Sequence, residues 1–169
     1  MRLEPLEERF VPDFEALTLD PDVLRFTRVP TSREAGFGAG WIAGYVRGWE
    51  DGARAGFAIV GEVNSAFLGM IGLIRIDWDA LDAELGYVVA PAARGRGVAG
   101  RAIDLVSRWA FDELRLARIE AWIDVENAAS QRVAERAGYT REGVRRSTHF
   151  KEGNRVDMAV YSLLPAQLP

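Results

Sequence analysis

The stretch Ala90-Pro91-Ala92-Ala93-Arg94-Gly95-Arg96-Gly97-Val98-Ala99-Gly100 decides how the rest of the chain is interpreted. An apolar, strand-like run from Leu85 to Val89 precedes it, and a helical pattern follows it. Glycines let the backbone turn sharply and approach a ligand closely. The first turn of the following helix offers unpaired N–H groups and the positive end of the helix dipole. The stretch therefore predicts an anion site suited to a phosphate or pyrophosphate, and Arg94, Arg96 and Arg101 add full charges there.

This loop can be parsed in two ways. Gly95-Arg96-Gly97-Val98-Ala99-Gly100 fits the G-x-G-x-x-G fingerprint of dinucleotide-binding proteins. That fingerprint needs its first glycine directly after a strand, whereas Ala90 to Arg94 intervene here, and the N-terminal half lacks repeated strand–helix–strand units. The second parse is Arg94-x-x-Gly97-x-Ala99, which resembles the R/Q-x-x-G-x-G/A acyl-CoA loop of the GNAT N-acetyltransferases. An ordinary glycine-rich turn is the alternative without function.

Length and composition predict one globular, soluble domain over residues 1–169, because 49% of the residues are hydrophobic and 27% are charged. The net charge of −4 argues against nucleic acid as the main partner. The absence of cysteine excludes disulfides and thiolate sites, and the single histidine, His149, excludes a multi-histidine metal site, so no metal is expected. The longest apolar run, Phe67 to Ile74, is too short to span a membrane. Because Met1 to Pro5 show no signal-peptide core, we expect a cytoplasmic protein.

Hydrophobic periodicity predicts a mixed α/β order of elements. The expected strands are Arg2 to Leu6, Phe57 to Glu62, Phe67 to Asp77, Ala83 to Val89, Arg118 to Asp124, and two strands between Tyr139 and Leu164 around a turn at Glu152 to Asn154. Helices are expected near Pro12, at Val23 to Phe26, from near Ser32 to Asp51, from Val98 to Leu114, and from Asn127 to Gly138. The three strands between Phe57 and Val89 suggest an antiparallel meander. The strand–helix–strand unit that follows should be parallel and right-handed.

The expected helix from Ser32 to Asp51 rests on the capping-box spacing of Thr31 and Glu34. Its apolar residues have helical spacing, but five glycines weaken it. The aromatic residues between Phe37 and Trp49 either belong to the core or line a pocket for an acceptor.

Four local patterns together carry a family resemblance. They are Ala83-Glu84-Leu85-Gly86-Tyr87, the Arg94 loop, Asn127-x-x-Ser130 with Ala137-Gly138-Tyr139, and Asp157-Met158 leading into Tyr161-Ser162-Leu163. They resemble the RimJ/RimL-type branch of the GNAT superfamily. The resemblance implies the GNAT acyl-CoA N-acyltransferase fold, an α/β (α+β) mixed sheet flanked by about four helices. This sheet would be splayed between the strands that end at Val89 and near Asp124.

The same resemblance places acetyl-CoA, as cosubstrate, in that opening. Its pyrophosphate would lie on the backbone N–H groups of Arg96 to Gly100, and its pantetheine arm would pair with the backbone near Val88 and Val89. The side chain of Asn127 would reach the same arm. From the residues alone, Asn127 is an N-cap with Ser130 three positions later.

Attack of a neutral amine on a thioester needs a base that removes the ammonium proton. Glu84 is the first candidate, with a paired or solvent-facing strand glutamate as the alternative. His149 is the second, and it stands where the relatives have a glutamate thought to be the base; a surface histidine beside Lys151 is the alternative. Ser130 matches the serine proposed as the acid in those relatives, whereas Ala134 stands where other members have a tyrosine. Tyr87, like Tyr139, is interpreted as a packing residue.

The expected function is acetyl transfer from acetyl-CoA to a primary amine, in the first place an N-terminal α-amine of a protein or peptide. An α-amine has a pKa of about 7.7 to 8.0, against about 10.4 for lysine, so it is more easily made neutral. The alternatives are a small-molecule amine (antibiotic, polyamine or amino acid), a catalytically weak acyl-CoA-binding regulatory module, and a nucleotide-dependent oxidoreductase. No nucleic-acid or membrane partner is expected, and the protein should be a monomer or homodimer.

Overall fold

The structure, a computed structural model, describes residues 1–168 and is built on one mixed sheet. The seven strands lie in the order β1-β2-β3-β4-β5-β7-β6. Their bounds are β1 (Arg2–Pro5), β2 (Ala55–Val60), β3 (Phe67–Asp77), β4 (Asp82–Val89), β5 (Arg118–Asp124), β6 (Thr140–Lys151) and β7 (Asn154–Leu163). The helices are α1 (Val11–Leu17), α2 (Pro21–Phe26), α3 (Phe37–Glu50), α4 (Val98–Asp112) and α5 (Ala128–Arg136). The predicted mixed α/β class is confirmed, with five α-helices in this part of the chain.

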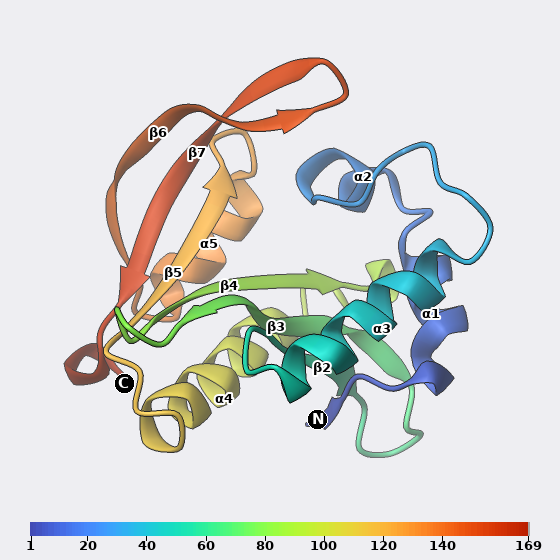
Figure 1. Ribbon diagram of the computed structural model, residues 1–169, viewed down its shortest axis with the longest axis horizontal. Helices are drawn as coiled ribbons and strands as arrows, with labels where there is room; N and C mark the ends of the chain where they lie inside the picture. Colours follow the sequence, from blue (N-terminus) through green and yellow to red (C-terminus); the bar gives the residue numbers. More distant parts are fainter. Residues whose placement is uncertain (169) are drawn as a thin grey trace.

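The sheet separates between β4 and β5, as expected. β2, β3 and β4 form the predicted antiparallel meander. β5 is parallel to β4, but the two strands pair only where Asp82–Glu84 meets Arg118–Glu120. Beyond Glu84 they diverge, and β5 continues with β7 as its partner, while β6 pairs with the far edge of β7 (Figure 1). Within residues 1–168, Leu85 to Val89 therefore have no strand partner on the side of β4 that faces β5.

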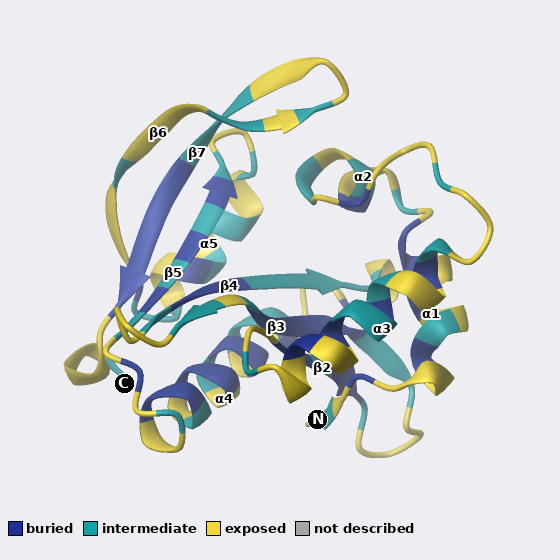
Figure 2. Ribbon diagram, viewed as in Figure 1, coloured by how far each residue is buried: buried dark blue, intermediate teal, exposed yellow. Residues whose placement is uncertain are grey.

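Two apolar clusters fix this arrangement from opposite faces of the sheet. One packs the apolar face of α4 against the sheet and includes Ile103, Val106 and Tyr161. The other lies under α1 and α3 and includes Phe14 and Ile42. Figure 2 shows the buried ribbon concentrated where these helices meet the strands. β4 contributes Leu85 to the first cluster and Val88 to the second, and burial of such side chains stabilises the fold by about 1.5–3 kcal/mol each.

The start of α3 differs from the prediction. The helix begins at Phe37, and Gly36 precedes it with a left-handed φ of +83°. The predicted capping box is wrong because Thr31 has a distant partner. Its N–H donates to the Glu152 carboxylate at 3.1 Å, and its hydroxyl donates to the same oxygen. Thr31 therefore holds the loop before α3 against the turn between β6 and β7.

No helix among residues 1–168 is long and apolar enough to cross a lipid bilayer.

Candidate active site

The glycine-rich loop leads from β4 into α4 through two left-handed residues. Pro91–Ala93 form a short 3₁₀ turn, after which Gly95 and Gly97 have φ values of +73° and +72°. Only glycine adopts this conformation readily. The first hydrogen bond of α4 runs from the N–H of Arg101 to the carbonyl of Gly97 at 3.2 Å. The N–H groups of the first turn, at residues 98–100, consequently have no acceptor within the helix, which is the geometry that binds anions.

Arg94 has partners within the protein that the sequence does not indicate. Its guanidinium lies 2.6 Å from Asp20 and 3.0 Å from Asp22, and its Nε donates to the Val89 carbonyl at 3.1 Å. Although burial acts in the opposite direction, the hydrogen bond from Arg94 lowers the pKa of Asp20. Arg94 therefore connects the loop to the start of α2, and its contact with a phosphate stays a prediction. The exposed side chains of Arg96 and Arg101 remain as the cations beside the first turn.

Asn127 caps α5, as the sequence indicates. Its Oδ1 accepts the N–H of Ser130 at 3.0 Å, and the helix runs on from Ala128. Asn127 follows the end of β5 by three residues, and its amide nitrogen takes no part in the cap. The cap and the predicted contact with a pantetheine arm are thus compatible, because they use different atoms.

Replacing Asn127 with alanine should lower the free energy of unfolding by about 1 kcal/mol, because the Ser130 N–H loses its acceptor. For a protein of this size that corresponds to a fall of about 2–4 °C in Tm. Thermal unfolding monitored by circular dichroism measures it. Asn127→Ser is the matched control, since serine caps equally well and should keep the wild-type Tm. An unchanged Tm in Asn127→Ala would show that the cap contributes no stability.

Ser130 has a partner that sequence reasoning missed. Its hydroxyl oxygen lies 2.7 Å from the Tyr87 hydroxyl oxygen, which bridges β4 and α5. Burial raises the pKa of Tyr87, so this phenol is neutral and available as a donor. Strand alternation places Tyr87 on the face of β4 that looks toward α4 and α5, but the match to position 130 depends on how α5 docks.

Glu84 is a buried, paired carboxylate at the fork of the sheet. Its side chain lies opposite Glu120 of β5, just before the strands diverge. The residue is 5% exposed, and the Arg28 guanidinium lies 2.6 Å from its Oε1. Burial raises the pKa of Glu84, even though the Arg28 and Arg75 guanidinium groups act to lower it. Glu84 is thus paired and not solvent-facing, and its role as a base stays a prediction.

His149 lies in β6 and lines a cavity of about 320 Å³. The other lining residues are Arg28, Trp122, Thr148, Phe150 and Met158. Burial lowers the pKa of His149, the charges of Arg28 and Lys151 lower it further, and Asp124 acts in the opposite direction. The imidazole is therefore neutral at pH 7 and has a lone pair that can take a proton. Arg28 connects the two candidate bases, because it contacts Glu84 and lines the His149 cavity.

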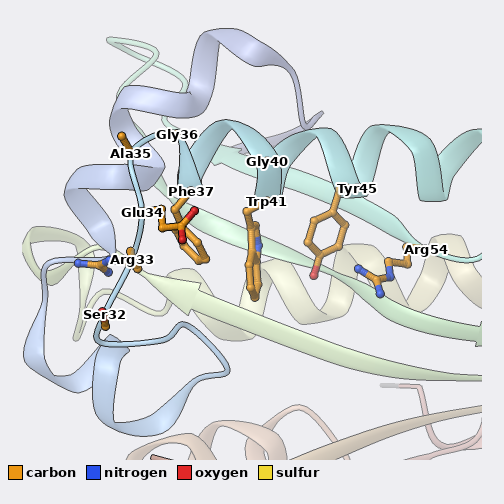
Figure 3. A pocket seen from close by; sticks show the side chains of 11 residues that line it. Ser32, Arg33, Glu34, Ala35, Gly36, Phe37, Gly40, Trp41, Tyr45 and Arg54 are labelled. Atoms are coloured by element: carbon orange, nitrogen blue, oxygen red, sulfur yellow. The ribbon is translucent and has the colours of Figure 1, made fainter.

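A second cavity, of about 560 Å³, lies along α3. Phe37, Trp41 and Tyr45 project from one side of the helix into it (Figure 3). Burial raises the pKa of Tyr45 to about 12, and its environment includes the charges of Arg28 and Glu84. Trp49, in contrast, stacks on Trp109 with ring centroids 5.8 Å apart. Phe37, Trp41 and Tyr45 thus both line the cavity and pack in the apolar cluster under α3, whereas Trp49 is 44% exposed at the surface.

The turn between β6 and β7 contacts the segment that contains α2 and the loop before α3. Lys151 donates from Nζ to the carbonyls of Leu24 and Thr27, at and just beyond α2. Together with the contact between Thr31 and Glu152, these bonds join the hairpin to the α2–α3 segment. Within residues 1–168, no group of three or more His, Cys, Asp or Glu side chains has an arrangement that could hold a metal ion.

The curated proteins that match this chain include several N-acetyltransferases. YjcK of Bacillus subtilis (strain 168), classed by name as an N-acetyltransferase, is 36% identical over 109 residues, which cover 64% of this chain and 60% of that protein. YdaF of the same strain, classed by name among ribosomal N-acetyltransferases, is 35% identical over 101 residues, covering 60% and 55%. The matched segments thus span less than two thirds of these relatives. Spermidine N(1)-acetyltransferase of Vibrio cholerae is 28% identical over 85 residues, covering 50% and 49%.

Solved structures share the fold over almost the whole chain. Spermidine N-acetyltransferase of Vibrio cholerae with CoA and spermine superposes with a TM-score of 0.85 at 21% identity, covering 98% of this chain and 96% of that one. RimL, a ribosomal L7/L12 α-N-protein acetyltransferase in complex with CoA, gives a TM-score of 0.85 at 19% identity, covering 96% and 92%. Most decisively, the model of the acetyltransferase (GNAT) domain matches residues 1–140. The splayed sheet, the glycine-rich loop before α4 and this match agree, and the chain belongs to the GNAT acetyltransferase family.

Proposed function

We propose that this protein transfers an acetyl group from acetyl-CoA to a primary amine by direct attack of the amine on the thioester. The observation that carries the proposal is the separation of β4 from β5, with an anion site at the start of α4 and two candidate bases nearby. GNAT acetyltransferases use acetyl-CoA, and two of the solved neighbours hold CoA. Family membership leaves the dinucleotide-dependent oxidoreductase without support.

In this proposal the cosubstrate follows the unpaired edge of β4. The pyrophosphate binds the N–H groups of residues 96–100, and Arg96 and Arg101 contribute charge. The pantetheine arm pairs with free backbone groups near Val88 and Val89 and with the amide nitrogen of Asn127. Because Arg94 already occupies the Val89 carbonyl, the arm uses the remaining groups of this edge.

Residues of β4 and of β6 share the steps of the proposed acetyl transfer. His149 removes the proton from the attacking amine, while Glu84 orients the Arg28 guanidinium beside it. A backbone N–H on the β4 edge stabilises the oxyanion of the tetrahedral intermediate. When that intermediate collapses, the C–S bond breaks and the thiolate of CoA leaves.

Ser130 and Tyr87 act on the leaving sulfur. A thiol has a pKa of about 8.5, well below that of a phenol or an alcohol, so neither hydroxyl surrenders its proton fully. Tyr87 donates instead to the Ser130 oxygen, and Ser130 donates a hydrogen bond to the sulfur. Hydrogen bonds to a charged acceptor are about twice as strong as neutral ones, so this help increases as the thiolate forms.

For the acceptor, we propose a protein or peptide N-terminal α-amine. Its pKa lies close to neutrality, so one neutral histidine suffices as base. A small-molecule amine is the second candidate, supported by the cavity along α3 and by the spermidine acetyltransferase among the relatives.

A panel of acceptors tests the proposal. The enzyme is incubated with isotopically labelled acetyl-CoA and three classes of amine: peptides with a free N-terminus, N-terminally blocked peptides containing lysine, and small amines. Mass spectrometry should locate the label on the α-amine of the first class. Label on lysine side chains alone, or on small amines alone, rules out the α-amine. A chain that binds acetyl-CoA but labels none of the three is the regulatory module instead.

A further inference from the structure

We infer that the acceptor carries negative charge close to the amine that is acetylated. This rests on the proposed function and names the substrate class of the same site. The chemistry that fits is an N-terminus followed at once by acidic residues, rather than a polyamine.

The first observation is the charge of the hairpin that bears His149. Residues 144–157 contain four arginines or lysines against two carboxylates, although the whole chain has a net charge of −4. The excess of positive charge is therefore local to the candidate acceptor site, where the general acidity of the protein predicts the opposite.

The second observation is that the carboxylates around the His149 cavity already have partners. Glu84 binds Arg28, and Asp124 accepts the N–H of Glu126 at 2.8 Å. The remaining pairs are Glu126 with Arg25, Glu152 with Thr31, and Asp157 with the N–H of Ser147. Each carboxylate of this group thus accepts at least one hydrogen bond within the protein, and the charges of Glu84 and Glu126 are balanced by arginines, which reduces the negative charge offered to a polyamine.

The third observation is that the cations of the hairpin lie on the rings that line the cavity. The Arg145 guanidinium lies 4.1 Å from the centroid of the Trp122 ring, and that of Arg155 lies 5.4 Å from Phe150. Both rings line the His149 cavity. Within residues 1–168, neither arginine forms an ion pair with a carboxylate. These guanidinium groups are thus positioned to meet the carboxylates of a bound acceptor.

The charge of the hairpin should produce a large preference for acidic acceptors over basic ones. The attraction between opposite charges is several times stronger near a protein surface than in water, because the effective dielectric constant is lower there. Each additional acidic residue of an acceptor should strengthen its binding to these arginines, and each additional ammonium group of a polyamine should weaken it. A difference of about 1.4 kcal/mol is already tenfold in kcat/KM.

Competition between matched acceptors tests the inference. Two peptides share the same N-terminal residue and differ at the second and third positions, which are aspartate in one and lysine in the other; spermidine is the third acceptor. The wild type should show at least a tenfold higher kcat/KM for the aspartate peptide, and the preference should shrink as salt rises. Arg145→Glu should reduce or reverse it, and Arg145→Gln should have an intermediate effect.

Arg141→Glu is the matched control, because it makes the same charge change in β6 next to Tyr161, away from the His149 cavity. It should leave the peptide preference intact. Preference of the wild type for spermidine or the lysine peptide overturns this inference alone, as do equal effects of the two glutamate variants. Absence of label on every amine overturns the proposed function and this inference with it.

Discussion

Gly97→Glu should abolish the stabilisation that acetyl-CoA gives the wild-type protein. At a hundred times its dissociation constant, a ligand that binds only the native state stabilises it by about 2.7 kcal/mol. For a protein of this size the wild-type Tm should rise by about 5–10 °C. The glutamate adds a carboxylate at the first turn of α4, where the pyrophosphate needs the same N–H groups. It also forces a side chain onto a residue with φ of +72°.

The backbone strain and the charge can be separated with Gly97→Ala. Alanine carries the left-handed strain, of about 1–2 kcal/mol, but no charge. Both variants should melt below the wild type without ligand, while Gly97→Ala keeps part of the shift produced by acetyl-CoA. Differential scanning fluorimetry with and without acetyl-CoA measures both quantities. A wild-type protein that does not respond to acetyl-CoA, or a full shift in Gly97→Glu, would contradict the assignment of this loop.

Loss of the base should have the second large effect, and we expect it at His149. General acid–base catalysis typically contributes about 10²–10⁴-fold, so His149→Ala should lower kcat by that order with little change in the KM for acetyl-CoA. Its pKa lies below the usual 6.5, mainly because of burial. The base form therefore predominates at pH 7, and wild-type activity should fall only as the pH drops through that lowered pKa. In His149→Ala, this fall of activity at acidic pH, the acidic limb of the pH–activity profile, should be absent.

Glu84→Gln is the matched comparison, because the amide oxygen still accepts a hydrogen bond from Arg28. We expect a smaller loss of kcat than in His149→Ala, with the acidic limb retained. A larger loss in Glu84→Gln would assign the base to the glutamate at the fork. If both variants keep wild-type turnover from about pH 6 to 9, a range that spans the ordinary histidine pKa, neither residue is the base.

Elements with a strong local pattern could be predicted from sequence, because their own residues determine them. The apolar face from Val98 to Ala110 specifies α4, and β5 occurs at its predicted bounds, Arg118–Asp124. The Asn127 cap is equally local, since the acceptor and donor are three residues apart. For α4 and for the Asn127 cap, the residues that determine the structure lie within one or two helical turns of each other.

Contacts between distant segments could not be predicted in this way. Thr31 has the local spacing of a cap, but a carboxylate 121 residues away takes both of its donors. Arg94 has the sequence of a phosphate ligand, but Asp20 lies 74 residues earlier and pairs with it. Such partners depend on how helices and hairpins dock, and a single sequence carries no periodic signal for that.

The central claim, direct transfer from acetyl-CoA to an amine within one complex, is tested by initial rates. The release of CoA thiol is followed while acetyl-CoA is varied at several fixed concentrations of the best acceptor from the panel. Direct attack requires both substrates to be bound together, so double-reciprocal plots should intersect. Parallel lines are the signature of an acetylated enzyme that forms before the acceptor binds, and they would contradict the account.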